Sequence, residues 1–209
     1  MRAYHFLSAC DALDDIRHRR LKISKLDDLN DPFELLAVAQ PKQEIRDWMF
    51  RFKKQMAANY GLLCFSRSWH RPALWGHYAD KHRGMALGFD LAPWLAKDVS
   101  YVDERAPLGA LDEVTAQMML YTKHSDWRYE QECRMFARLN DLDAATGHYF
   151  AAFGSELALR EVIMGSLCTV PQSEVSAALA ASKFKADLIA ARLAFKSFRV
   201  VKNLRPSAT

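Results

Sequence analysis

The sequence has little that would form a metal site or a disulfide framework. Its four cysteines are far apart and form no CxxC pair: Cys10, Cys64, Cys133 and Cys168. The spacing typical of zinc fingers is therefore absent. The seven histidines form neither an HxxxH nor an HExxH pattern, so we expect no metal. Cys64 and Cys133 fall in predicted strands and are interpreted as small buried hydrophobes.

Long apolar segments are also missing. The N-terminus, MRAYHFLSAC, lacks the apolar run of a signal peptide, and no other run approaches the length that a bilayer requires. The sequence therefore predicts a cytoplasmic protein that has no membrane partner. The motif GxSxG is absent as well, which removes the local signature of a serine nucleophile.

Charge and composition set only broad limits. The 209 residues are 50% hydrophobic and 26% charged, with a net charge of +4. This balance is ordinary for a globular chain, and we expect one domain spanning residues 1–209. The mild excess of Lys and Arg permits a nucleic-acid partner without requiring one, because the basic residues are spread along the chain.

One stretch, residues 61–90, organises the predicted fold. Two apolar runs, Gly61–Phe65 and Gly84–Phe89, are typical of buried strands. Between them, Pro72–Asp80 is predicted to form a short helix whose apolar face carries Leu74, Trp75 and Tyr78. His77 and Tyr78 are therefore expected near the wall of a site.

Further elements are predicted on both sides of this stretch. Helices are expected at 8–20 (capped by Ser8), 43–60 (ended by Gly61), 111–123 and 171–181, with Val114 among the inward residues of the third. The 43–60 helix is amphipathic, and its apolar face carries Ile45, Trp48, Met49, Phe52 and Met56. Strands are expected at 3–7, 21–24, 99–102, 148–153 and 159–164, and in the second half of Trp127–Arg138. Residues 187–193 and 198–203 can form two closing antiparallel strands, but a helix is the alternative for the first, because its alanines favour that state. The predicted class is α+β, with a mixed or antiparallel sheet and several flanking helices.

Four groups of residues are candidates for chemistry. The first is Tyr4 with His5 on the first strand, and the second is the loop Asn30–Glu34, NDPFE. We expect this loop to pack on the core through Phe33, with Asp31 or Glu34 fixed by an Arg or by backbone donors. The third group is Trp75, His77 and Tyr78.

The fourth group is Glu130-x-Glu132. Two carboxylates on one strand face repel each other and raise one pKa unless a cation or ligand compensates. If the strand starts early, both glutamates point to the same side. Arg128 and Arg134 share this parity, so a solvated ladder of ion pairs is the competing interpretation.

Together these segments resemble a bacterial family, domain-of-unknown-function family 2971. The resemblance covers nearly the whole chain and rests on Tyr4–His5, NDPFE at Asn30–Glu34, LCFS at Leu63–Ser66, LWGHYADKHRGMALGFD at Leu74–Asp90, Lys123, WRYEQECR at Trp127–Arg134 and EVIMG at Glu161–Gly165. Cys133 departs from the pattern, because the family often has an aromatic residue there. The family has no settled activity, so this resemblance by itself implies no reaction.

The order of His, Tyr and Glu along the chain is also similar to that of ADP-ribosyltransferases, and Glu-x-Glu resembles the pair of their arginine-directed members. This resemblance implies NAD as substrate, with His5 on its ribose and Tyr78 stacked on nicotinamide. Glu132 would stabilise the oxocarbenium-like transition state, and Glu130 would orient the acceptor. Tyr4, Asn30, Asp31 and His77 complete the expected NAD-binding set.

The leading hypothesis is therefore an ADP-ribosyltransferase-like enzyme, acting as a bacterial toxin or phage-defence effector on an acceptor that the sequence does not identify. The alternative is a non-enzymatic nucleic-acid or protein-binding module in bacterial defence or stress response. A third hypothesis is a metal-independent hydrolase or nuclease that uses Glu130 and Glu132.

Overall fold

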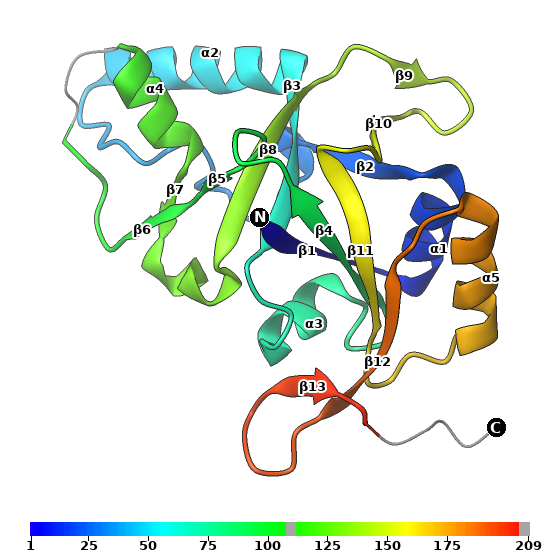
Figure 1. The fold of residues 1–209 in the computed structure, drawn as a ribbon. Coiled ribbons are helices and arrows are strands. Elements are labelled where there is room, and N and C mark those ends of the chain that lie inside the picture. Colours follow the sequence, from blue (N-terminus) through cyan, green and yellow to red (C-terminus); the bar gives the residue numbers. More distant parts are fainter. Residues whose placement is uncertain (108–111, 205–209) are drawn as a thin grey trace. The chain divides into compact units, whose positions relative to one another are not determined.

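The computed structural model describes residues 1–107 and 112–204, and Figure 1 shows its helices and strands. The chain forms two compact units, each assembled from segments that are separate in the sequence. Unit 1 contains Met1–Leu21, Phe65–Leu95 and Ala152–Thr209, of which 205–209 lie outside the described residues, and unit 2 contains Lys22–Cys64 and Ala96–Ala151. Several helices and a mixed sheet confirm the predicted α+β class. That residues 1–209 form one domain stays a prediction.

Five strands form the sheet of unit 1, in the order β13-β12-β11-β4-β1. Their bounds are β1 (Arg2–Leu7), β4 (Met85–Leu91), β11 (Leu157–Met164), β12 (Asp187–Leu193) and β13 (Val200–Lys202). Neighbours are antiparallel except β11 and β12, which are parallel and are connected through α5 (Gln172–Ser182). Almost every residue of β4 is buried, as its continuous apolar run predicts.

The helices of unit 1 begin where the sequence predicts. α1 (Ala9–His18) is capped by Ser8, whose hydroxyl accepts the N–H of Asp11 at 3.1 Å. Its buried side packs against α5. α3 (Pro72–Tyr78) starts with Pro72 and buries Trp75, whose ring meets the edge of Phe6 at a centroid distance of 5.2 Å.

The remaining strands, most of them short, lie wholly or for most of their length in unit 2. They are β2 (Arg20–Lys25), β3 (Tyr60–Ser66), β5 (Lys97–Asp98), β6 (Ser100–Val102), β7 (Thr122–His124), β8 (Glu132–Arg138), β9 (Leu142–Asp143) and β10 (His148–Ala152). β3 lies between β2 and β8, and β5 pairs with the other edge of β8. β6 and β7 form a separate parallel pair.

Two α-helices cover unit 2, α2 (Gln43–Asn59) and α4 (Glu113–Leu120). Met49 of α2 is buried with Val38 and Met119, and other members of the predicted apolar face of α2 pack around this cluster. Two 3₁₀-helices, η1 (Leu26–Asp28) and η2 (Ser125–Glu130), complete the unit. The amphipathic pattern of α2 therefore identified its inward face.

Two local predictions are wrong. Gly61 does not end α2, because Tyr60 is already extended as its C-cap and Gly61 belongs to β3. Val114 is not inward, since its side chain is 75% exposed while Met119 is buried. Residue 111, where that helix was expected to start, lies outside the described residues. The strand expected in the second half of Trp127–Arg138 is confirmed as β8, which begins at Glu132 and follows η2.

All four cysteines are free thiols. Among the helices of residues 1–107 and 112–204, none combines the length and the apolar character needed to cross a membrane.

Candidate functional site

Five charged side chains are buried together in unit 2, and we call them the charge cluster. Each is less than a tenth exposed: Glu34, Lys123, Glu130, Glu132 and Arg134. They come from the loop after η1, from β7, from the end of η2 and from β8. Ionised side chains are rarely buried unless they are paired, so the cluster is the most unusual chemical feature of the unit.

Every N–H donor of the Arg134 side chain has an acceptor, and four of the five acceptors are carboxylate oxygens of the cluster. Its guanidinium forms a two-point contact with Glu34, with both N–O distances at 2.7 Å. A second two-point contact joins Nε and Nη2 to the two oxygens of Glu132, at 2.8 and 3.0 Å. The remaining N–H donates to the carbonyl of Leu120 at 3.0 Å. Both oxygens of Glu132 are thus held by one cation.

Lys123 lies among the three carboxylates. Its Nζ is 2.8 Å from Glu130, 3.5 Å from Glu132 and 3.5 Å from Glu34. The ammonium also lies 4.4 Å from the ring centroid of Trp127, within the range of a cation–π contact. Lys123 therefore connects the carboxylates of the cluster to an aromatic side chain.

The cluster holds three carboxylates against two cations, and its pKa shifts follow from that balance. Burial disfavours the ionised form of Glu132, but Arg134 and Lys123 outweigh burial and hold the pKa of Glu132 below its ordinary value of 4.5. Burial alone would lower the pKa of Lys123, but the carboxylates around it raise that pKa. Burial, with Glu132 nearby, raises the pKa of the Cys64 thiol well above its ordinary value. The pKa shifts of Glu132, Lys123 and Arg134 therefore all favour the ionised form at neutral pH.

A single backbone turn brings the two predicted glutamates to one ammonium. Glu130 ends η2, Glu132 begins β8, and Gln131 between them has a φ of 46°, in the left-handed region. The Glu132 N–H donates to the Tyr101 hydroxyl at 2.8 Å, which fixes the start of the strand. The glutamates share a side because of this turn, and strand alternation is not the cause.

The competing interpretation, a solvated ladder of ion pairs, is wrong in two respects. The ion pairs are buried, and Arg128 takes no part in them. Arg128 is exposed and its Nη2 donates to the carbonyl of Tyr101 at 3.5 Å.

The loop Asn30–Glu34 reaches the cluster through its last residue. The Asp31 carboxylate is buried and accepts the N–H of Phe33 at 2.9 Å, while Glu34 binds Arg134. These contacts confirm that the loop is fixed by an Arg and by backbone donors. Phe33, however, is 59% exposed, so the prediction that it anchors the loop is wrong. Leu35, with a φ of 63°, turns into the core instead.

A cavity of about 540 Å³ adjoins the cluster, and we call it the Lys123 cavity. Residues from three segments line it: 31–33 with 36–37, 102–105, and 122–124 with 126–127. Asp31 of the predicted NAD-binding set lines the cavity, and Lys123 belongs to both the cavity and the cluster. Within the described part of the chain, the lining includes neither Glu130 nor Glu132.

The other predicted NAD-binding residues, Asn30 apart, belong to unit 1. Tyr4 and His5 are consecutive on β1 and therefore point to opposite faces of its sheet. Tyr4 packs against the hydrophobic cluster that contains Trp75, whereas the centroid of the His5 ring lies 5.6 Å from that of Phe65. Burial and the nearby Glu161 raise the pKa of Tyr4 to about 12. Tyr4 and His5 thus do not share one surface of the strand.

His77 and Tyr78 lie at the end of α3, with ring centroids 6.0 Å apart. His77 is exposed and Tyr78 is half-buried. Asn30 is exposed and directly precedes Asp31 in unit 2. In unit 2 the structure therefore brings Glu130 and Glu132 to Lys123 and places Asp31 in the wall of the same cavity as Lys123. Tyr4, His5, His77 and Tyr78 belong to unit 1.

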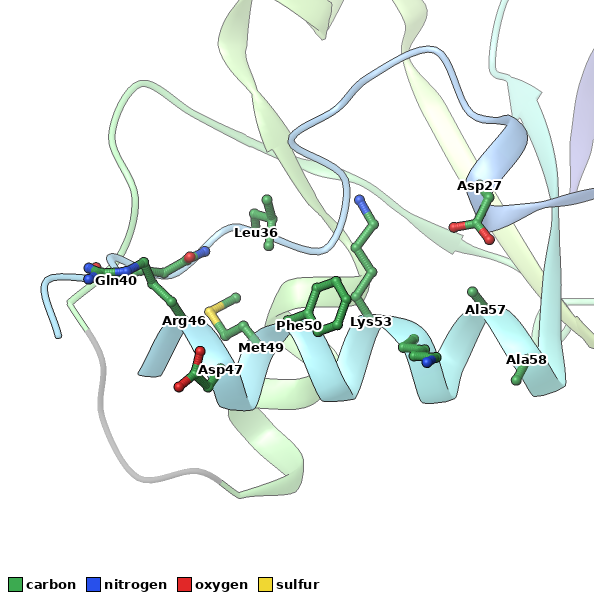
Figure 2. A pocket seen from close by; sticks show the side chains of 11 residues that line it. Asp27, Leu36, Gln40, Arg46, Asp47, Met49, Phe50, Lys53, Ala57 and Ala58 are labelled. Carbon is green, nitrogen blue, oxygen red and sulfur yellow. The ribbon is translucent and has the colours of Figure 1, made fainter. Parts of the chain in front are cut away.

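A second and larger cavity, of about 930 Å³, runs along α2. Figure 2 shows Phe50 and Lys53 rising from α2 on the side where Leu36 lies, with Asp27 near the end at Ala57. Volume alone would favour it, but no cluster of buried ionised groups adjoins it among the described residues. Because shifted ionisable groups beside a pocket mark functional sites, the Lys123 cavity is the better candidate.

Sequence reasoning missed Lys123, Arg134 and Tyr101 as members of the site. The sequence does contain a signal for Lys123, because this cation lies only a few positions before the Glu-x-Glu pair and could compensate its negative charge. Within residues 1–107 and 112–204, no group of three or more His, Cys, Asp or Glu side chains is arranged to hold a metal ion.

Comparisons with protein-family models, with curated proteins and with solved structures find no significant match for this chain.

Proposed function

We propose that the protein is an NAD-using enzyme of the ADP-ribosyltransferase type, and that it binds NAD in the Lys123 cavity. The observation that carries this proposal is the chemistry of the lining. It combines aromatic rings with charged groups of both signs beside the buried charge cluster. A volume of about 540 Å³ suits a ligand of this kind, because small-molecule sites span roughly 300–1,000 Å³.

Each part of NAD has a partner of suitable chemistry in the lining. Trp127 and Phe33 offer ring surface to a flat base or to nicotinamide. Arg105 offers a guanidinium to the pyrophosphate. The carboxylates of Asp103 and Asp126 can accept hydrogen bonds from ribose hydroxyls. A cavity with aromatic, cationic and acidic walls is suited to a nucleotide and poorly suited to a purely apolar ligand.

The contacts of Glu130 and Glu132 support a positioning role. Both hold Lys123, and Glu132 is fully engaged by Arg134, so these carboxylates set the place and charge of the lysine at the cavity wall. That Glu132 is the catalytic carboxylate, with Glu130 orienting the acceptor, stays a prediction. The four free thiols support a reducing, cytoplasmic setting for this proposed activity.

The test is NAD binding by calorimetry, on the wild type and on Trp127→Ala. We expect the substitution to weaken NAD binding about tenfold, because one ring contact is worth roughly 1.4 kcal/mol. Trp94→Ala is the matched control, since Trp94 is 75% exposed and belongs to unit 1. It should leave the dissociation constant unchanged.

Nicotinamide release, measured on the same proteins with and without cell extract as acceptor, then separates binding from catalysis. If Glu132 is catalytic, Glu132→Gln lowers release by about 100–1,000-fold in the folded fraction. Wild-type protein that neither binds nor cleaves NAD would refute the proposal. Equal NAD affinities of wild type and Trp127→Ala would refute the assignment to this cavity.

A further inference from the structure

The hairpin formed by β12 and β13 has an unusual charge. Residues 187–202 contain one carboxylate, Asp187, and four cations: Arg192, Lys196, Arg199 and Lys202. The net charge of this short segment is therefore +3, compared with +4 for the whole chain. Figure 1 shows the connecting loop projecting from the end of the unit 1 sheet. The hairpin is a concentrated basic element in a chain that is otherwise balanced.

The same loop exposes two aromatic rings. Phe195 is 80% exposed and Phe198 is 98% exposed. Burying a phenylalanine side chain is worth about 1.5–3 kcal/mol, and neither ring obtains this stabilisation within the chain. The guanidinium of Arg192 lies 4.5 Å from the centroid of Phe195. Rings and cations therefore alternate along the loop.

Backbone hydrogen bonds hold the loop in place. The Ala194 N–H donates to the Arg199 carbonyl and the Arg199 N–H to the Ser197 carbonyl, both at 2.9 Å. Val200 is bound twice to His70, through its N–H at 3.0 Å and through its carbonyl to Nδ1 at 2.7 Å. The rings are thus presented on an anchored turn, which lowers the entropy that a partner must remove on binding.

We propose that this hairpin binds single-stranded nucleic acid. Phe195 and Phe198 stack on unpaired bases, and Lys196 and Arg199 contact the phosphates on either side. Interleaved rings and cations are the combination that single strands require, because their base faces are exposed and their backbone is anionic. A duplex hides its base faces in the stack, so the exposed rings favour a single strand.

A membrane surface fits the loop less well. Lys196 and Ser197 lie between the two rings, where insertion would carry a cation and a hydroxyl into the apolar layer. In the described part of the chain, the N–H groups of residues 195–198 have no backbone acceptor. Such groups are costly in lipid, whereas phosphate oxygens accept backbone N–H donors.

The experiment is fluorescence anisotropy of a labelled oligouridylate of about 12 nucleotides with the full chain, in a series of salt concentrations. We expect Phe198→Ala to weaken binding about tenfold, as the loss of one stacked base implies. Trp94→Ala, which removes a comparably exposed ring elsewhere in unit 1, should have no effect.

Two further arms make the result decisive. Lys196→Gln combined with Arg199→Gln should reduce the slope of log affinity against log salt by about 1.4, because each phosphate contact contributes roughly 0.7 on single strands. A duplex RNA of the same length should bind more weakly than the single strand. The altered side chains are exposed, and far-ultraviolet circular dichroism checks that each variant folds.

Three outcomes would overturn the proposal. They are no binding at about 50 mM salt, equal losses for Phe198→Ala and Trp94→Ala, or hairpin-dependent binding to anionic phosphatidylserine vesicles without binding to RNA. The proposal does not involve the Lys123 cavity, so its failure and the failure of the proposed NAD activity are separate results.

Discussion

Replacing Arg134 by methionine should destabilise the protein strongly at neutral pH. Methionine keeps the unbranched aliphatic stem but removes every donor that the guanidinium gives to Glu34, Glu132 and the Leu120 carbonyl. Removing one partner of a buried ion pair costs roughly 3–5 kcal/mol, because the remaining charge is left uncompensated. For a chain of this size, a loss of about 4 kcal/mol lowers the midpoint of thermal unfolding by about 8–16 °C.

The loss should depend on pH in a definite direction. The folded pKa of Glu132 lies below its ordinary value of 4.5, so its stabilising effect is fully present above that pH and disappears as the pH falls through the folded pKa. Without Arg134, burial of the Glu132 carboxylate is less compensated, so the pKa of Glu132 in the folded variant rises and acid relieves the excess negative charge. The difference in unfolding free energy between wild type and Arg134→Met should therefore be largest near pH 7 and smaller near pH 4.

Urea unfolding at both pH values measures this difference. Arg138→Met is the matched control, because Arg138 ends the same strand, is exposed, and lies over the ring of Tyr60 at 5.7 Å. It should change the unfolding free energy by about 0.5 kcal/mol or less. If Arg134→Met is as stable as this control at pH 7, the cluster does not stabilise the fold as described.

A second variant separates the guanidinium from the charges that it compensates. Replacing Arg134, Glu34 and Glu132 together by Met, Leu and Leu removes the uncompensated carboxylates as well as the cation. Because buried ion pairs exchanged for apolar groups are often neutral in stability, this triple variant should be more stable than Arg134→Met alone.

Two further predictions concern packing. Gly84→Ala should lower the unfolding free energy measured in denaturant by about 1–3 kcal/mol, because its new methyl group would lie 2.1 Å from the Leu7 carbonyl oxygen. Gly76→Ala in α3 should instead stabilise the chain by about 0.5–1 kcal/mol, because nothing lies within 4 Å of the added carbon. Equal effects of the two substitutions would contradict the packing described at Gly84. Phe33→Ala should change the unfolding free energy and the melting temperature little, because the ring is 59% exposed. Leu35→Ala, at a buried position, should lower the unfolding free energy by about 2–5 kcal/mol. The reverse order would show that Phe33 anchors the loop.

Local signals in the sequence predicted most of the secondary structure. Ser8 before an apolar-periodic segment predicted the start of α1, and the side chains around Met49 predicted the inward face of α2. These features depend on residues within a turn or two of one another. Val114 shows the limit of such reasoning, because an apolar residue at helical spacing faces inward only if tertiary packing covers it.

The charge cluster could not be predicted in the same way. Glu34 and Arg134 are 100 positions apart, and nothing in the local pattern around either residue indicates the pairing. The sharing of Lys123 by Glu130 and Glu132 depends on the left-handed turn at Gln131, a conformation that side-chain alternation does not predict. Sequence reasoning selected the correct pair of glutamates but gave the wrong geometric cause.

The division into two units was also hidden in the sequence. Three of the four boundaries between units fall inside strands, in β2, β3 and β10. A boundary within a strand needs no flexible linker, so it leaves no Gly, Pro or Ser-rich segment to find. Composition therefore had no means of indicating it.

The cluster also changes how activity measurements on the glutamates must be interpreted. Glu132 receives two donors of Arg134 and lies 3.5 Å from Lys123, so Glu132→Gln removes structural contacts together with any catalytic charge. Loss of nicotinamide release in that variant would therefore not identify a catalytic residue unless the folded fraction and NAD affinity were measured on the same sample. Only a fall in turnover at unchanged affinity and unchanged folded fraction would assign the chemistry to Glu132, because a disturbed lysine at the cavity wall would weaken binding as well.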